Sequence, residues 1–265
     1  MKHFGLIIIG DEILSGKRQD KHMAKVIELL AARGLALAWA RYVGDRRDHI
    51  TAALRDAFSG DDIVFSCGGI GATPDDHTRQ CAAAALQRPL VLHPLARELI
   101  LERMRDVARE QGKPYEPERA DNQHRLNMGM FPQGAELIAN PYNKIPGFSV
   151  GDVHFVPGFP VMAHPMIEAL LDGRYAALHG SHRQAEHSVI VMGSMEASLT
   201  PLMEAIEADH PGVRVFSLPS VDHPVYGRHI ELGVKGAPDV MPAAFEALRR
   251  GLSVLGVALG PEVVR

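Results

Sequence analysis

The 265-residue chain is 46% hydrophobic and 23% charged, as is usual for a soluble globular protein, and at roughly 150 residues per domain its length favours two domains over one. Its formal net charge of −4 excludes the basic character of most nucleic-acid-binding domains, so we expect no nucleic-acid partner. With two cysteines and no apolar run near the ~18 residues of a membrane span, we expect a cytoplasmic protein without a disulfide framework or a membrane partner.

Strands and helices are predicted to alternate in the first 90 residues. Residues Phe4–Ile9 are continuously apolar, as in a central parallel strand that is covered on both faces. Apolar residues then recur at helical spacing, and two further strands are predicted between and after these helices. This order predicts an α/β domain with a mostly parallel sheet and helices on both faces. The predicted helices span residues 23–30 and 50–58, and the further strands span residues 35–43 and 63–67.

The sequence after residue 90 is predicted to complete this domain and then to form a second, smaller domain. A charged helix is expected over residues 95–111, then loops with short strands that include residues 153–156, then a helix over residues 162–171. The stretch 172–186, which contains two glycines, is predicted to be a linker. After it, the order strand, helix, strand, strand, helix predicts a small α+β domain with helices on one face. We therefore place the domains at residues 1–173 and 184–265.

The strongest chemical signal is the segment SCGGIGATPDDHT at residues 66–78, where a buried strand passes into a helix. Ligands of open α/β sheets bind outside the carboxyl ends of the strands. Gly68, Gly69 and Gly71 would let the backbone approach a ligand closely, and the N–H groups of the following helix attract an anion. We expect Thr73 to cap that helix, with a proline at its first position. The segment therefore predicts a phosphate-binding loop.

Asp75 and Asp76 fall in the expected first turn of this helix. Acidic residues there stabilise a helix through its dipole by up to about 1 kcal/mol each, and this purely structural interpretation stays open. One acid would suffice for that purpose, whereas two carboxylates beside a glycine loop can also hold a divalent cation that offsets their repulsion of a phosphate. We therefore assign both as candidate catalytic and metal-binding residues, for Mg²⁺, Mn²⁺ or Co²⁺.

A second acidic motif, Gly10-Asp11-Glu12, follows the first predicted strand. Because the carboxyl ends of parallel strands meet at one rim, we expect these residues to lie beside the glycine loop, with Asp11 and Glu12 as further catalytic candidates. A solvated turn is the structural alternative. Asp20 is a ligand-binding candidate as well, although its simplest role is to cap the next helix.

Together these motifs resemble the molybdopterin-binding domain family, which includes the MoaB/Mog-type proteins. The segments GDEILSG, VGD (residues 43–45) and GGIGATPDDHT carry the resemblance. It is strongest to the N-terminal domain of the competence/damage-inducible CinA proteins, and the segment GSMEASL at residues 193–199 extends it into their middle domain. The resemblance ends before the amidase domain of those proteins, so we expect no deamidation of nicotinamide nucleotides.

The resemblance implies that the N-terminal domain binds a phosphorylated nucleotide or pterin at these loops. CinA-type domains are associated with metal-dependent cleavage of ADP-ribose-like pyrophosphates, and MoaB/Mog-type domains with adenylylation of molybdopterin. We take a metal-dependent nucleotide pyrophosphatase as the first hypothesis. The alternatives are a non-catalytic protein that binds molybdopterin or a nucleotide, and a molybdopterin adenylyltransferase. Molybdopterin stays an alternative cofactor, and a homo-oligomer is left open.

Three loops depart from the family pattern. Asp20-Lys21-His22 stands where the family has Asp-x-Asn, and Val161 to Ala163 lacks the glutamate of the usual Pro-Ser-Glu-Met stretch. The third loop reads Asn-Lys-Ile-Pro-Gly at residues 143–147 instead of Gly-Thr-Ala-Pro-Gly. Because such loops shape the ligand pocket, these departures bear on the substrate rather than on the fold. Further ligand-binding candidates in this loop are Lys144, which would add a cation for a phosphate or be simply solvated, Pro146 and Gly147.

Overall fold

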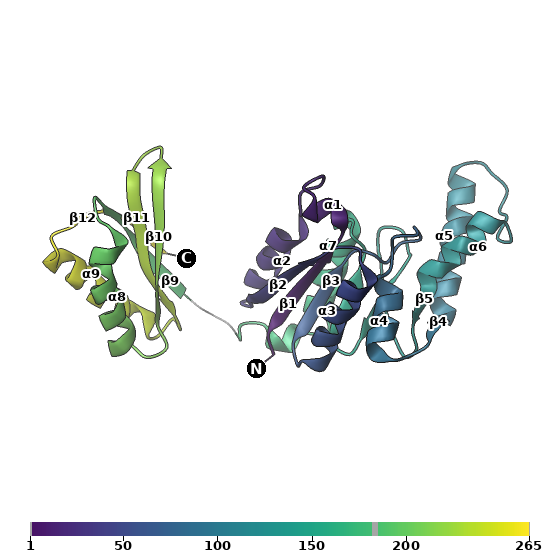
Figure 1. Cartoon of the computed structure of the whole chain (residues 1–265), viewed down its shortest axis with the longest axis horizontal. Coiled ribbons are helices and arrows are strands. Elements are labelled where there is room, and N and C mark those ends of the chain that lie inside the picture. Colours follow the sequence, from purple (N-terminus) through teal and green to yellow (C-terminus); the bar gives the residue numbers. More distant parts are fainter. Residues whose placement is uncertain (1, 182–184, 265) are drawn as a thin grey trace. The chain divides into compact units, whose positions relative to one another are not determined.

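The computed structural model describes residues 2–181 and 185–264 of the chain. The chain divides into two compact units, Met1–His179 and Gly180–Arg265, which Figure 1 colours along the sequence. The linker expected over residues 172–186 includes the junction of the units, but its residues 182–184 lie outside the described residues. Among the described residues, no helix has both the length and the apolarity that crossing a bilayer requires.

The first unit is built on one six-stranded sheet. Its strands are β1 (Phe4–Ile9), β2 (Leu37–Val43), β3 (Ile63–Cys67), β6 (Glu136–Ile138), β7 (Gly147–Val150) and β8 (Val153–Val156). They lie in the order β2-β1-β3-β8-β7-β6. β2, β1, β3 and β8 run parallel, and β7 pairs antiparallel with both of its neighbours. The predicted strands at residues 4–9, 63–67 and 153–156 are confirmed.

Helices cover both faces of this sheet (Figure 1). One face packs against α3 (Arg47–Ser59) and α4 (Thr78–Leu86), and the other against α2 (His22–Ala31) and α7 (Pro160–Asp172). Successive side chains of a strand point to opposite faces, so Ile7 and Ile9 of β1 join the first core while Leu6 and Ile8 join the second. Every residue of β1 is buried, which explains its uninterrupted apolar sequence. Two short helices complete this part, α1 (Asp11–Leu14) and the 3-10 helix η2 (Ala176–Leu178).

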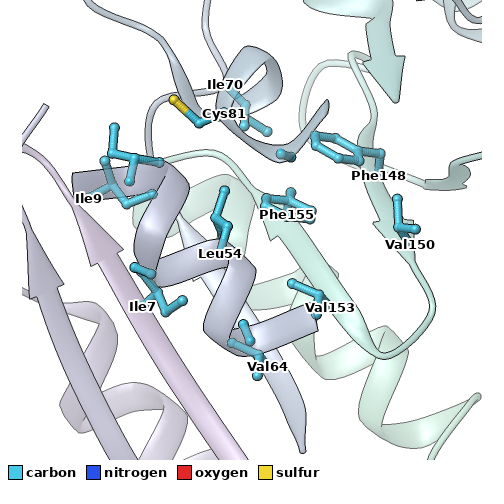
Figure 2. Packing of buried hydrophobic residues seen from close by; sticks show 14 of the residues in the cluster. Ile7, Ile9, Leu54, Val64, Ile70, Cys81, Phe148, Val150, Val153 and Phe155 are labelled. Atoms are coloured by element: carbon cyan, nitrogen blue, oxygen red, sulfur yellow. The ribbon is translucent and has the colours of Figure 1, made fainter. Parts of the chain in front are cut away.

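Residues between α4 and β6 form an excursion beside the main sheet. It contains β4 (Leu90–Leu92), α5 (Pro94–Glu110), α6 (Ala120–Arg125), the 3-10 helix η1 (Leu126–Gly129) and β5 (Met130–Pro132). Phe131 of β5 stacks on Phe148 with 4.6 Å between ring centroids, and Phe148 stacks on Phe155 at 4.3 Å. These rings join the excursion to the core beneath α3, in which Figure 2 shows Leu54 beside Phe155.

Tyr175 closes the C-terminal end of the first unit. Its side chain is 5% exposed, and its hydroxyl donates a hydrogen bond to Oδ1 of Asp152 at 2.8 Å. The same hydroxyl lies 2.5 Å from Nε2 of His154, whose Nδ1 lies 2.7 Å from the Ser149 hydroxyl. Burial lowers the pKa of His154 to about 3. The core of the first unit therefore continues past residue 173, where we expected the first domain to end.

The second unit is a four-stranded antiparallel sheet with both helices packed into one core. It contains β9 (Ala185–Met192), α8 (Glu196–Asp209), β10 (Arg214–His223), β11 (Gly227–Gly236), α9 (Met241–Val254) and β12 (Ala258–Val264), with the strand order β10-β11-β9-β12. The small α+β fold is thus confirmed. β12 was not expected, because Gly260 and Pro261 interrupt its apolar pattern. It is an edge strand with a register shift between Leu259 and Glu262, which is where a sheet tolerates proline.

The role of Tyr175 predicts where the first unit can be cut. A fragment of residues 1–179 should melt close to the first unit of the full chain, whereas a fragment of residues 1–173 should be destabilised by roughly 3 kcal/mol, the usual cost of removing a buried aromatic side chain. Thermal melts of both fragments, followed by circular dichroism, check this. Equal stability of the two fragments would show that Tyr175 does not close the core.

Candidate functional site

A pocket of about 500 Å³ lies at the carboxyl ends of the parallel strands. Its wall is formed by residues that directly follow β1, β3 and β8, together with Asp45, which follows β2. From β1 the chain passes to β2 on one side, and β3 then lies on the other side of β1. Because the connections that follow β1 and β2 run in opposite directions along the sheet, a crevice forms outside the strand ends, where open α/β folds bind their ligands. We call this cavity the rim pocket.

The glycine loop forms one wall of the rim pocket. Gly68 and Gly69 have φ values of 107° and 68°, which side chains rarely tolerate. A Cβ atom on Gly68 would collide with the carbonyl oxygen of Ile9, and one on Gly69 with the Thr78 hydroxyl. That hydroxyl donates a 3.0 Å hydrogen bond to the carbonyl oxygen of Gly68 and so fixes the loop. Among the described residues, the backbone N–H groups of residues 69–72 donate none of the loop hydrogen bonds, and successive free N–H groups suit an anion.

The helix expected to begin near Thr73 begins at Thr78 instead. Residues Thr73 to Asp76 form a turn in which the N–H of Asp76 donates to the carbonyl oxygen of Thr73 at 3.1 Å. Oδ2 of Asp76 accepts hydrogen bonds from the N–H of Thr73, at 2.9 Å, and from its hydroxyl. These side-chain bonds, with Pro74 in the second turn position, favour a turn over a helix. The expectations that Thr73 caps a helix and that Asp75 and Asp76 stabilise its first turn are therefore wrong.

The loops after β1 and β2 are joined by two aspartates. The N–H of Asp11 donates to Oδ2 of Asp45 at 2.8 Å, and the N–H of Asp45 donates to Oδ1 of Asp11 at 3.1 Å. Burial raises the pKa of Asp45, and repulsion from Asp11, Glu12 and Asp75 raises it further. Where neighbouring negative charges raise the pKa of a carboxyl group, a bound cation would be stabilised.

The donors of the rim pocket fit a cation that is bound together with a phosphate. Glu12, Asp45, Asp75 and Asp76 all line the pocket. Within residues 2–181 and 185–264, however, no three His, Cys, Asp or Glu side chains lie close enough to hold a metal ion by themselves. Mg²⁺ is usually held by one or two protein carboxylates, and phosphate oxygens of the substrate and water complete its coordination.

The structure brings most of the predicted site residues into this wall. Asp11 supports the wall through Asp45 without being one of the described residues that line it. The predicted residues that line the rim pocket are Gly10, Glu12, Gly68, Gly69, Gly71, Thr73, Asp75 and Asp76.

Four predicted ligand-binding residues lie outside the described wall of the rim pocket. Asp20, which precedes the N-cap residue of α2, accepts hydrogen bonds from the first two N–H groups of that helix, those of His22 and Met23, at 2.8 and 3.0 Å. The Lys144 ammonium donates to carboxylates on α5 at 2.6 and 2.7 Å. Lys144 is therefore neutralised rather than offered to a phosphate. The other two are Pro146 and Gly147, the residue that begins β7.

The lining residues without a predicted site role include three with charged or aromatic side chains: Arg18, Asp45 and Phe159. Asp45 belongs to the VGD motif at the end of a predicted strand, and this position at a strand end was the available signal. Arg18 and Phe159 gave no comparable signal, since both lie in loops whose local sequence does not indicate that they meet the glycine loop. In the structure, Phe159 is 57% exposed. His22, which departs from the family pattern, has Nε2 3.1 Å from the carbonyl oxygen of Gly158 and thus contacts the loop after β8.

Comparison with known proteins relates the first unit to one family. Residues 5–177 match the family model described as a probable molybdopterin binding domain. A CinA-like protein of Desulfosudis oleivorans is 30% identical over 215 residues, which are 79% of this chain and 50% of that protein. A CinA-like protein of Geobacter metallireducens is 28% identical over 264 residues, which are 98% of this chain and 60% of that protein. The chain thus spans 50 to 60% of the length of these relatives.

A solved structure gives the same relationship. The crystal structure of CinA from Thermoplasma acidophilum, a protein described as of unknown function, superposes with a TM-score of 0.53 at 28% sequence identity. The superposition covers 64% of this chain and 96% of that one.

The raised pKa of Asp45 predicts that Asp45→Asn stabilises the metal-free protein. The new amide oxygen can still accept the N–H of Asp11, while the repulsion and the cost of burying a charge are removed, for a gain below about 1 kcal/mol after solvent screening. Chemical denaturation at pH 7 with EDTA measures the difference. It should shrink as the pH falls through the raised pKa, because the penalty exists only while Asp45 is ionised.

Asp48→Asn is the matched control for this prediction. The Arg46 guanidinium lowers the pKa of Asp48 to about 2, so its charge is favourable in the folded state and its removal should not stabilise the protein. A gain from Asp48→Asn as large as that from Asp45→Asn would contradict a local effect in the rim pocket.

Proposed function

Since the chain belongs to the molybdopterin-binding domain family, we propose that its rim pocket binds a phosphorylated nucleotide or pterin and hydrolyses an ADP-ribose-like nucleotide pyrophosphate with the help of a divalent cation. This proposal rests on one observation: the rim pocket is lined both by groups that attract an anion and by groups that attract a cation. The N–H groups of residues 69–72 favour an anion, whereas four carboxylates on the same wall repel one. A divalent cation bound with a pyrophosphate satisfies both.

Each group of the wall has a role in this proposal. The free N–H groups of the glycine loop and the Arg18 guanidinium bind and orient the phosphates. Asp75 and Asp76 would hold the cation together with phosphate oxygens of the substrate. When bound, the cation supplies charge neutralisation and activates the water nucleophile. The exposed ring of Phe159 offers a surface on which a base or a pterin can stack.

Asp45 is the carboxylate best suited to accept the proton of the attacking water. A general base works best when its pKa is raised toward the operating pH, and burial and neighbouring charges raise that of Asp45. Its hydrogen bonds with Asp11 fix its position. The repulsion that destabilises the folded protein is thus the property that suits this residue for proton transfer.

A non-catalytic binding protein is the second candidate function. It is favoured by the lack of a three-donor metal group among the described residues and by the hydrogen bonds that tie Asp76 to Thr73. Such a protein would use the glycine loop and Phe159 to hold a nucleotide or pterin without turnover. Molybdopterin adenylylation stays a third, weaker alternative.

Variants of the two loop aspartates test the hydrolase. Asp75→Asn and Asp76→Asn should lower metal-dependent hydrolysis of ADP-ribose at least about 100-fold, because a ligand of the cation contributes several kcal/mol to the transition state. Stability should change by less than about 1 kcal/mol, since the amide oxygen that replaces the Asp76 carboxylate can still accept from Thr73. Turnover is measured over a range of Mg²⁺, Mn²⁺ and Co²⁺ concentrations, beside melting curves of each variant.

The controls separate the two candidate functions. Asp48→Asn removes a carboxylate that does not line the rim pocket and should keep wild-type turnover. A thermal-shift screen of the wild type with ADP-ribose, FAD, ATP and a pterin, with and without each metal, reports binding alone, since a ligand at 100 times its Kd adds about 2.7 kcal/mol. Full activity in both loop variants would exclude the metal role. A wild type that is stabilised by a nucleotide or pterin yet inert on every pyrophosphate would favour the binding protein.

A further inference from the structure

A second pocket, of about 380 Å³, adjoins the rim pocket. The two cavities share Ala72, Thr73 and Asp76, so the turn after the glycine loop forms a wall of both. The second pocket is also lined by Arg47, the first residue of α3, and by Arg79, the second residue of α4. We call it the arginine pocket.

Arg79 is a buried cation that forms no ion pair with any carboxylate among the described residues. The residue is 3% exposed. Two of its N–H groups donate to backbone carbonyl oxygens, that of Gly71 at 2.6 Å and that of Asn127. Its buried Nε–H has no acceptor within the described part of the chain. Burial lowers the pKa of Arg79 to about 10, and the charge of Asp76 offsets only part of this shift. The lowered pKa reflects the cost of holding a charge without an ion-pair partner away from water.

A second cation of the arginine pocket, Arg47, also favours an anion. The exposed Arg47 guanidinium forms no ion pair within the described part of the chain, and His77 and His124 lie in the same lining. The carboxylate among the described lining residues is that of Asp76, which is already bonded to Thr73. Two helices, α3 and α4, begin at this pocket, and the partial positive charge of a helix N-terminus adds to that of the arginines. The rim pocket has the opposite character, with four carboxylates and one arginine among its described lining residues.

We propose that the arginine pocket is a binding site for a phosphate group, which Arg47 contacts directly and which the buried charge of Arg79 stabilises from beneath. A phosphate would supply a counter-ion for Arg79, and arginine suits phosphate because its planar fork can donate two hydrogen bonds. The shared wall further suggests the source of that phosphate. If the rim pocket binds a nucleotide pyrophosphate, as proposed above, a ligand with a separate phosphomonoester would place that group in the arginine pocket. This part of the inference rests on the proposed function of the rim pocket.

Inorganic phosphate is the probe that tests the site. It is titrated into the full chain in EDTA at constant ionic strength, with binding followed by calorimetry and by the melting temperature. Arg47→Ala and Gln80→Glu, two exposed positions in the lining, should each weaken phosphate binding about tenfold or more, as expected for the loss of a hydrogen bond to a charged group or the addition of a like charge. Arg79 is left intact because it also holds the backbone at Gly71 and Asn127.

Arg55→Ala is the matched control, since Arg55 is an exposed arginine of the same helix and lines neither pocket. It should bind phosphate like the wild type. A wild type with no saturable binding, or an equal loss in Arg55→Ala and Arg47→Ala, would overturn the proposal. So would a loss in Arg18→Ala with none in Arg47→Ala, because the phosphate would then lie in the rim pocket.

Repeating the titration in EDTA with saturating ADP-ribose 2′-phosphate, which carries the phosphomonoester that ADP-ribose lacks, separates the sources of the phosphate. Unchanged affinity for inorganic phosphate would identify a site for the free ion, whereas competition by ADP-ribose 2′-phosphate but not by ADP-ribose would identify a site for the phosphomonoester of a ligand. The two proposals also fail separately. Phosphate binding that depends on Arg47, in a protein inert on ADP-ribose, would contradict the hydrolase alone. Metal-dependent turnover without phosphate binding would contradict the arginine pocket alone.

Discussion

The parallel pairing of β1 with both β2 and β3 is the constraint on which the rest of the first unit depends. Central parallel strands are covered on both faces, so β1 is apolar throughout and β3 and β8 are mostly apolar. The charged residues that line the rim pocket therefore lie in the loops that follow the strands. Because β1, β3 and β8 point the same way, those loops meet at one rim, and the order of the strands leaves a crevice there.

The carboxylates of the rim pocket repel one another, and this repulsion destabilises the fold unless a cation is bound. Asp11 and Asp45 accept each other's N–H groups, which keeps two like charges near Glu12 and Asp75. On the far side of the turn that ends at Asp76, Arg79 is buried without an ion-pair partner among the described residues. The large apolar cores on either face of the sheet offset both costs, and both would fall when ligands of opposite charge bind. Functional sites often hold such strain because the surrounding fold can support it.

Elements whose residue pattern is set by burial could be predicted from the sequence. Elements whose conformation depends on particular side-chain contacts could not. β1, β3 and β8 were predicted to the residue because short, mostly apolar runs between turn residues are typical of buried strands. The turn at Thr73 to Asp76 was predicted to be a helix start, since the same residue types cap helices and close turns, and only the bonds from Thr73 to Asp76 decide between them.

Longer-range contacts were beyond the reach of sequence patterns. Lys144 pairs with two carboxylates on α5, far away in the chain, so its neutralisation could not be seen locally. The partnership of Asp11 and Asp45 likewise required knowing that β1 and β2 are neighbours. Arg79 was hidden for a different reason, because an arginine at the start of a helix is usually exposed and nothing in its local sequence indicates its burial.

The hydrogen-bonded histidine in β8 makes the stability of the first unit fall at acidic pH. His154 is fully buried as a neutral ring between Ser149 and Tyr175, and its pKa is lowered from 6.5 to about 3. Its stabilising contribution is complete above pH 6.5, the value in the unfolded chain, and falls as the pH decreases toward 3, since only the unfolded chain takes up the proton. Each pH unit in that window costs about 1.4 kcal/mol. Mild acidification thus acts on the fold through proton uptake in the unfolded chain by a single side chain, one that is not among the described residues lining the rim pocket or the arginine pocket.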